Sequence, residues 1–109
     1  MKIAIIGSRN LCVENMEDFI PRDVTEIVSG GAKGVDRQAA EYARRHGIVL
    51  VEFLPEYKRY GRCAPLKRNE QIAAYADEAI AFWDGVSAGT RNIIALFEKA
   101  GKKVTVVRR

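Results

Sequence analysis

Three apolar segments of this chain each run into a glycine-bearing turn, and each turn is followed by a stretch with helical periodicity. The segments and their turns are Ile3–Ile6 with Gly7–Arg9, Ile27–Val28 with Ser29–Gly34, and Ile80–Phe82 with Trp83–Thr90. A helix N-terminus leaves several backbone N–H groups unpaired and carries partial positive charge, and glycine lets an anionic ligand approach that backbone. We therefore expect the three turns to form one anion-binding pocket.

Strand-like and helix-like segments alternate along the whole chain. Hydrophobic periodicity predicts strands at 2–6, 25–29, 48–53, 78–83 and 103–107, helices at 14–20, 34–46, 65–76 and 88–100, and a loop at 54–64. The strands at 2–6, 48–53 and 103–107 are nearly continuous apolar runs, which is typical of parallel strands buried on both faces. The predicted fold class is α/β: a Rossmann-like three-layer sandwich, with helices on both faces of a five-stranded parallel sheet.

The connectivity also predicts the order of the strands. Right-handed crossovers favour the order 3-2-1-4-5, numbered along the chain, with the switch point between strands 1 and 4. Strands 1, 2 and 4 are then adjacent, and these are the strands followed by the glycine turns. Glycine is also common in such turns for purely geometric reasons, but the coincidence favours a ligand-binding crevice at the carboxyl ends of these three strands.

Length and composition narrow the class of protein. A chain of 109 residues, 48% hydrophobic and 29% charged, is expected to form a single domain over residues 1–109. No secretory signal or segment of transmembrane length is recognisable, so we expect a cytoplasmic protein with no membrane partner. A net charge of +4 raises the expectation of a phosphorylated or polyanionic partner, with a merely solvated basic face as the alternative.

Several kinds of chemistry lack their sequence signatures. Neither the GxxxxGK[ST] spacing of a P-loop nor the GxGxxG of a dinucleotide fold is present, which disfavours ATP hydrolysis and hydride transfer with NAD. Cys12 and Cys63 are far apart and favour free thiols, and no cluster of histidine, cysteine and carboxylate side chains suggests a metal site. Mg²⁺ held through the phosphates of a ligand stays open, because it needs few protein groups.

Four motifs in order along the chain resemble the SLOG superfamily, most closely its YspA-like branch. They are Gly7-Ser8-Arg9, Ser29 through Asp36, Arg68-Asn69, and Phe82 through Asn92. The superfamily includes the DNA-processing protein A (Smf) domain and the LOG (Lonely Guy) proteins. The resemblance implies a Rossmann-like domain that binds nucleotides or nucleotide-derived molecules, often as a homodimer. In LOG proteins the implied activity is a phosphoribohydrolase that cuts the N-glycosidic bond of a nucleoside monophosphate.

The resemblance to the LOG loop PGGxGTxxE is partial. The loop falls on residues 83–93, where Gly89-Thr90 fits but Ile93 stands at the position of the glutamate. Arg68 matches the arginine that LOG proteins use beside that glutamate. For an enzyme, the resemblance implies catalysis by Arg68, with Asp84 or Asp36 as the substitute carboxylate.

The candidate ligand-binding residues come from the three turns and from the start of the helix at 65–76. They are Gly7, Ser8, Arg9, Ser29, Gly30, Gly31, Ala32, Lys33, Gly34, Asp36, Arg68, Asn69, Trp83, Asp84, Ser87, Gly89 and Thr90. Arg9 either binds phosphate or is a solvated turn residue, and Asp36 either accepts a ribose hydroxyl or complements a helix dipole. Trp83 either stacks on a base or packs in the core, and residues 57–62 form either a lid or an ordinary exposed loop.

Three functions remain open from the sequence. The favoured one is binding or sensing of a small phosphorylated nucleotide or nucleotide-derived ligand. The second is an N-glycosidase of nucleotide metabolism, which the missing glutamate weakens. The third is single-stranded nucleic acid binding, in which Tyr57 and Tyr60 among basic residues would act as a stacking platform.

Overall fold

A five-stranded parallel sheet with helices on both sides forms the protein. The computed structural model describes residues 1–31 and 33–109. The strands are β1 (Lys2–Gly7), β2 (Glu26–Ser29), β3 (Val49–Glu52), β4 (Glu78–Trp83) and β5 (Val104–Arg108). The helices are α1 (Val35–Arg45), α2 (Tyr57–Tyr60), α3 (Ala64–Tyr75) and α4 (Ala88–Lys99), with 3-10 turns at Met16–Phe19 and Gly61–Cys63. The strand order is β3-β2-β1-β4-β5 and every pair is parallel, which confirms the predicted fold class and order.

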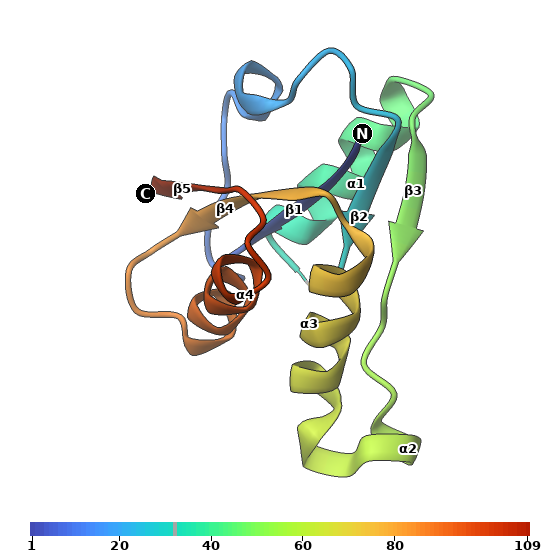
Figure 1. Cartoon of the computed structure of the whole chain (residues 1–109). Coiled ribbons are helices and arrows are strands. Elements are labelled where there is room, and N and C mark those ends of the chain that lie inside the picture. Colours follow the sequence, from blue (N-terminus) through green and yellow to red (C-terminus); the bar gives the residue numbers. More distant parts are fainter. Residues whose placement is uncertain (32) are drawn as a thin grey trace.

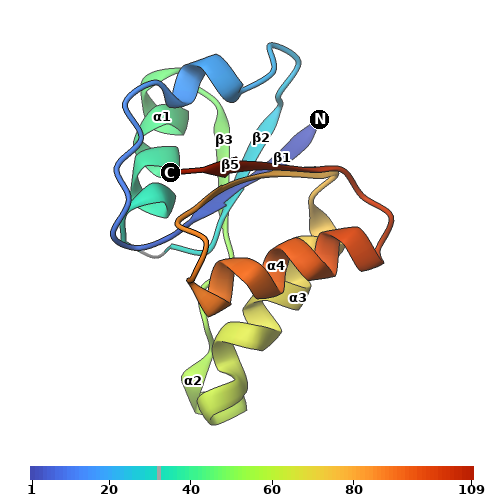
Figure 2. The same ribbon diagram turned by 90° about the vertical axis from the view of Figure 1, so that its left-hand side faces the viewer.

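The helices divide between the two faces of the sheet, which gives three layers. α1 lies on one face, and α3 and α4 lie on the other (Figure 1 and Figure 2). Side-chain alternation along β1 explains the division, because successive residues of a strand point to opposite faces. Ile3 and Ile5 pack in the cluster that includes α1, whereas Ala4 and Ile6 pack in the cluster that includes α3 and α4.

The two edge strands are more exposed than the sequence predicts. Val49 on β3 is 58% exposed and Val106 on β5 is 44% exposed, whereas β1 and β4 are buried along their lengths. The expectation that the apolar runs at 48–53 and 103–107 are buried on both faces is therefore wrong. Each edge strand has a neighbour on one side only, and three long helices do not cover the full width of the sheet.

Two helical segments also differ from the predicted pattern. The helix expected at 14–20 is only the 3-10 turn at Met16–Phe19, and the loop expected at 54–64 contains α2 and the 3-10 turn that follows it. One-turn helices are too short to show a 3.6-residue periodicity, so the sequence pattern could not distinguish them from loop. α2 lies at the end of α3, beyond the edge of the sheet (Figure 1). No helix in the described part of the chain is long and apolar enough to span a membrane.

The segment after β1 is held in place from two sides. The Ser8 N–H donates to the carbonyl of Phe82 at 3.1 Å, which ties the end of β1 to β4. Further along, the side chain of Gln38 on α1 both donates to the Val13 carbonyl and accepts from the Val13 N–H, each at 2.8 Å. The loop that carries Arg9 is thereby fixed between β4 and α1.

Candidate functional site

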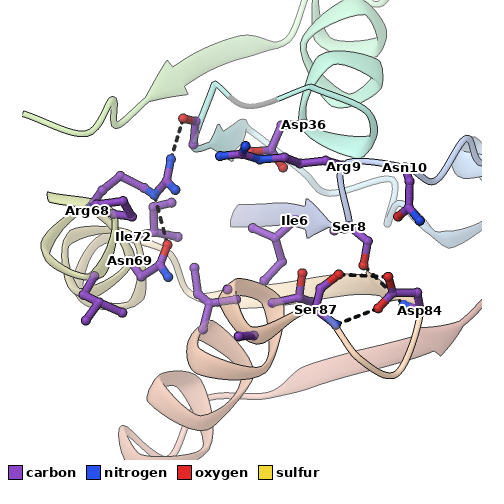
Figure 3. Close-up of a pocket in the computed structure, with 18 residues that line it drawn as sticks. Ile6, Ser8, Arg9, Asn10, Asp36, Arg68, Asn69, Ile72, Asp84 and Ser87 are labelled. Carbon is purple, nitrogen blue, oxygen red and sulfur yellow. Dashed lines mark hydrogen bonds between the residues drawn. The ribbon is translucent and has the colours of Figure 1, made fainter. Parts of the chain in front are cut away.

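A cavity of about 500 Å³ opens at the carboxyl ends of the central strands, between α1, α3 and α4 (Figure 3). Its walls come from the turns after β1, β2 and β4 and from the first turns of α3 and α4. The lining residues are Ile6, Gly7, Ser8, Arg9, Asn10, Gly30, Asp36, Pro65, Leu66, Arg68, Asn69, Ile72, Asp84, Ser87, Ala88, Gly89, Thr90 and Ile93. This is the switch point of the sheet, where strand order reverses and α/β proteins place their ligands.

Most of the candidate ligand-binding residues line this cavity. Those that do are Gly7, Ser8, Arg9, Gly30, Asp36, Arg68, Asn69, Asp84, Ser87, Gly89 and Thr90, and those that do not are Ser29, Gly31, Lys33, Gly34 and Trp83. Ser29 is buried, and its Oγ accepts the Gly31 N–H at 3.2 Å. Gly31 and Lys33 border a separate, smaller hollow beside α1. Ala32 lies outside the described residues.

Arg68 reaches across the cavity from α3 to the β2–α1 turn. Its Nη1 donates to the Gly30 carbonyl at 2.7 Å, and its Nε donates to Asn69 Oδ1 at 2.9 Å. Gly30 makes this approach possible, since a Cβ there would lie 2.5 Å from Nη1. Burial lowers the pKa of the Arg68 guanidinium, and the Asp36 carboxylate opposes that effect. A guanidinium stays protonated at any physiological pH, so Arg68 brings a fixed positive charge to the cavity.

Arg9 and Asp36 lie on the side of the cavity that the Arg68 guanidinium reaches. Asp36 is in the first turn of α1 and is only 6% exposed, whereas Arg9 is exposed at the rim. Figure 3 shows the Arg9 side chain extending toward the side where Asp36 and Arg68 lie. Repulsion from Arg9 also contributes to the lowered pKa of Arg68, which places the two positive charges within electrostatic reach of each other. An anion between the two guanidinium groups would relieve that repulsion.

The carboxylate of Asp84 accepts hydrogen bonds from residues of its own turn. Its Oδ1 accepts the N–H groups of Val86 at 2.9 Å and Ser87 at 2.8 Å, and its Oδ2 accepts the Ser87 hydroxyl at 2.9 Å. These bonds, the two backbone N–H groups first, lower the pKa of Asp84 to about 2. A carboxyl group with that pKa is ionised at neutral pH and is poorly matched to proton transfer. The catalytic role suggested for Asp84 stays a prediction, and this geometry favours a structural role.

The first turn of α4 presents backbone donors to the cavity. The side chain of the N-cap residue, Ser87, makes no capping hydrogen bond. The Ser87 N–H donates to the Asp84 carboxylate. The N–H groups of Ala88, Gly89 and Thr90 have no partner among the described residues. A Cβ added at Gly89 would meet no atom within 4 Å, so the space beside this residue is open. Unpaired amides, the positive end of the helix dipole and free volume thus coincide at one place.

Trp83 lies outside the cavity and supports the β4–α4 turn. Its indole Nε1 donates to the Ser87 carbonyl at 3.1 Å, and the Arg91 guanidinium lies over the ring at 5.5 Å from its centre. The base-stacking role suggested for Trp83 therefore has no support from this geometry.

Several residues that line the cavity are not among the ligand-binding residues predicted from the sequence. Asn10 lies at the rim, and the apolar wall consists of Ile6, Pro65, Leu66, Ile72, Ala88 and Ile93. Helical spacing could have identified two of them, because Ile72 is four residues after Arg68 and Ile93 is four residues after Gly89. The described residues contain no group of three or more histidine, cysteine or carboxylate side chains that could hold a metal ion.

Parts of the chain are similar in sequence to known proteins. Over 81 residues the chain is 36% identical to the Gene 61 protein of Mycobacterium phage D29; the aligned part is 69% of this chain and 65% of the phage protein. The chain thus spans just under two thirds of the length of that relative. No solved structure gave a significant match. The model of the family described as "YspA, cpYpsA-related SLOG family" matches residues 1–60, which is more than half of the chain. The protein therefore belongs to the YspA, cpYpsA-related SLOG family.

Proposed function

We propose that the protein binds or senses a small phosphorylated nucleotide, or a molecule derived from one, in the cavity at the carboxyl ends of β1, β2 and β4. Membership of the SLOG family supports a nucleotide-related function in general. The observation that carries the proposal is the coincidence of the unpaired α4 amides with Arg9 and Arg68 around one cavity of about 500 Å³. That volume falls within the range of pockets for small ligands.

The polar groups of the cavity favour an anion. Backbone N–H groups and guanidinium groups are donors only, and both bind phosphate oxygens well. The first turn of α4 supplies the amides, and Arg9 and Arg68 supply the guanidinium groups. Arg68 donates one hydrogen bond to Gly30 and one to Asn69. The guanidinium has five N–H groups, so the others can donate to a ligand.

The remaining walls suit the other parts of a nucleotide. Ile72, Ile93 and Leu66 form an apolar side against which a sugar or base can pack. Asp36 is the buried carboxylate of the cavity and could accept hydrogen bonds from ribose hydroxyls. Binding rather than glycosidic hydrolysis is favoured because Ile93 stands where LOG proteins have a glutamate, and the carboxylate of Asp84 is held in its own turn.

The test is a binding screen with defined probes. The four nucleoside 5′-monophosphates, the corresponding diphosphates and inorganic phosphate are added to the native protein, with and without Mg²⁺, and the melting temperature and binding heat are measured. A ligand at one hundred times its Kd stabilises the folded state by about 2.7 kcal/mol, so a true ligand raises the melting temperature measurably. A screen in which none of the nucleotides changes either readout contradicts the proposal.

Two arginine variants locate the binding. Arg68→Met removes the guanidinium from the cavity and is expected to weaken nucleotide binding roughly tenfold or more, as for a lost charged hydrogen bond. Arg91→Met removes the same charge from a residue that lies on Trp83, outside the cavity, and should leave the affinity nearly unchanged. Equal losses in both variants would indicate attraction by overall charge and no specific site. Release of free base from a nucleoside monophosphate would instead favour the N-glycosidase alternative.

A further inference from the structure

Both polar atoms of the Asn69 side chain are occupied within the protein. Asn69 is 6% exposed; its Oδ1 accepts from Arg68 Nε at 2.9 Å, and its Nδ2 donates to Asn92 Oδ1 at 2.9 Å. Arginine has no acceptor, so only the amide oxygen can face Nε, and the amide nitrogen is then turned toward Asn92. The orientation of the Asn69 amide is thus fixed by its two neighbours; the bond from Arg68 is drawn in Figure 3.

Through these bonds one side chain joins three walls of the cavity. Arg68 continues the chain to the Gly30 carbonyl after β2, and Asn92 belongs to α4, one turn beyond Gly89. The chain of hydrogen bonds therefore runs from the β2–α1 turn through α3 to α4. A guanidinium is planar, so fixing both Nε and Nη1 sets the direction of its remaining N–H groups.

We infer that Asn69 is a positioning residue, which aims the Arg68 guanidinium into the cavity and ties α3 to the first turns of α4, and that it does not contact the ligand itself. The inference rests on the proposed function, because the direction of Arg68 matters only for a bound anion. It revises the sequence expectation for Asn69, which placed it among the ligand contacts. If Asn69 acts by positioning Arg68, then replacing Asn69 should weaken nucleotide binding only while the Arg68 guanidinium is present.

A double-mutant cycle measures that dependence. Affinity for the four nucleoside 5′-monophosphates is measured by calorimetry in the native protein, Asn69→Ala, Arg68→Met and the double variant. Asn69→Ala is expected to weaken binding about tenfold in the native background, and by less than about twofold when Arg68 is already methionine. Gln71→Ala, on the same helix but outside the cavity, is the matched control and should change the affinity by less than about twofold. Equal weakening in both backgrounds would mean that Asn69 touches the ligand directly, and no weakening in either would remove its role.

A second readout needs no ligand and separates this inference from the proposed function. In the ligand-free protein the Arg68 Nε–H should give a distinct NMR resonance that exchanges slowly with water. Asn69→Ala should accelerate that exchange about tenfold or more, because the acceptor is lost, and Gln71→Ala should not. Unchanged exchange in Asn69→Ala overturns the inference. A native protein that binds no nucleotide contradicts the proposed function, while the exchange rates still decide whether Asn69 holds Arg68.

Discussion

The glycines of the β2–α1 turn and Gly89 in the first turn of α4 occupy their positions for different physical reasons. At Gly30 and Gly34 the protein itself occupies the space that a side chain would need. A Cβ would lie 2.5 Å from Arg68 Nη1 at the first position and 2.4 Å from the Arg9 carbonyl oxygen at the second. At Gly89 a Cβ would meet no atom within 4 Å. The fold accounts for the first two glycines but imposes no steric requirement for glycine at position 89, where the proposed ligand would approach the backbone.

The largest effect on stability is expected from Gly34→Ala. Gly34 has φ +73° and ψ −123°, a conformation that residues with a Cβ rarely adopt, and the new methyl group would press on backbone atoms of Arg9 and Ser8. Strain and overpacking together should lower the free energy of unfolding by about 3 kcal/mol. Urea denaturation monitored by circular dichroism measures the change.

Gly101→Ala is the control for this prediction. Gly101 also has a positive φ, +72°, but its side-chain position is open. It should therefore cost only the conformational strain, about 1 kcal/mol. Similar losses in the two variants would show that the close approach of Arg9 to Gly34 contributes nothing.

A smaller loss is expected from Gly30→Ala, because the atom in the way belongs to a side chain that can move. The methyl group would displace the Arg68 guanidinium from the Gly30 carbonyl, at a cost of about 1–2 kcal/mol in stability. Nucleotide affinity should fall as well, since Arg68 changes direction. In an Arg68→Met background the same substitution should cost clearly less, and an undiminished cost would mean that the guanidinium is not what excludes a side chain at this position.

The hydrogen bonds to the Asp84 carboxylate in the turn before α4 should make the stability of the protein depend on pH. The pKa of Asp84 is lowered to about 2 in the folded protein because backbone N–H groups bind its carboxylate. A group with a depressed folded-state pKa contributes stability above its unfolded pKa, near 3.9, and that contribution is lost as the pH falls from about 4 to about 2. Melting temperatures of the native protein and Asp84→Asn should therefore converge over this range. Parallel curves would show that the carboxylate has the same pKa in both states.

The sequence predicted the location of the cavity better than the contacts that the surrounding residues make. The crossover rule and the glycine turns depend on chain connectivity, and they correctly brought the turns after β1, β2 and β4, with Asp36, to one cavity. Arg68 became a candidate through the resemblance to the SLOG superfamily, and it lines the same cavity. Whether a side chain faces the cavity depends on local turn geometry, which periodicity does not encode. Trp83 therefore turned out to lie outside, Asp84 to bind its own turn, and Asn69 to hold Arg68.

The smallest effect on stability, and the sharpest test of the comparison, is expected from Gly89→Ala. Alanine favours a helix over glycine by up to about 1 kcal/mol, and the open space around Gly89 imposes no clash, so the ligand-free protein should be as stable as the native one or slightly more stable. The methyl group would nevertheless enter the volume beside the α4 amides, where an anion has to approach the backbone closely. Nucleotide affinity should therefore fall, by roughly tenfold, as for a lost charge-assisted hydrogen bond. Opposite signs for stability and affinity cannot arise from damage to the fold, and an affinity equal to that of the native protein would show that the ligand does not approach α4 at this residue.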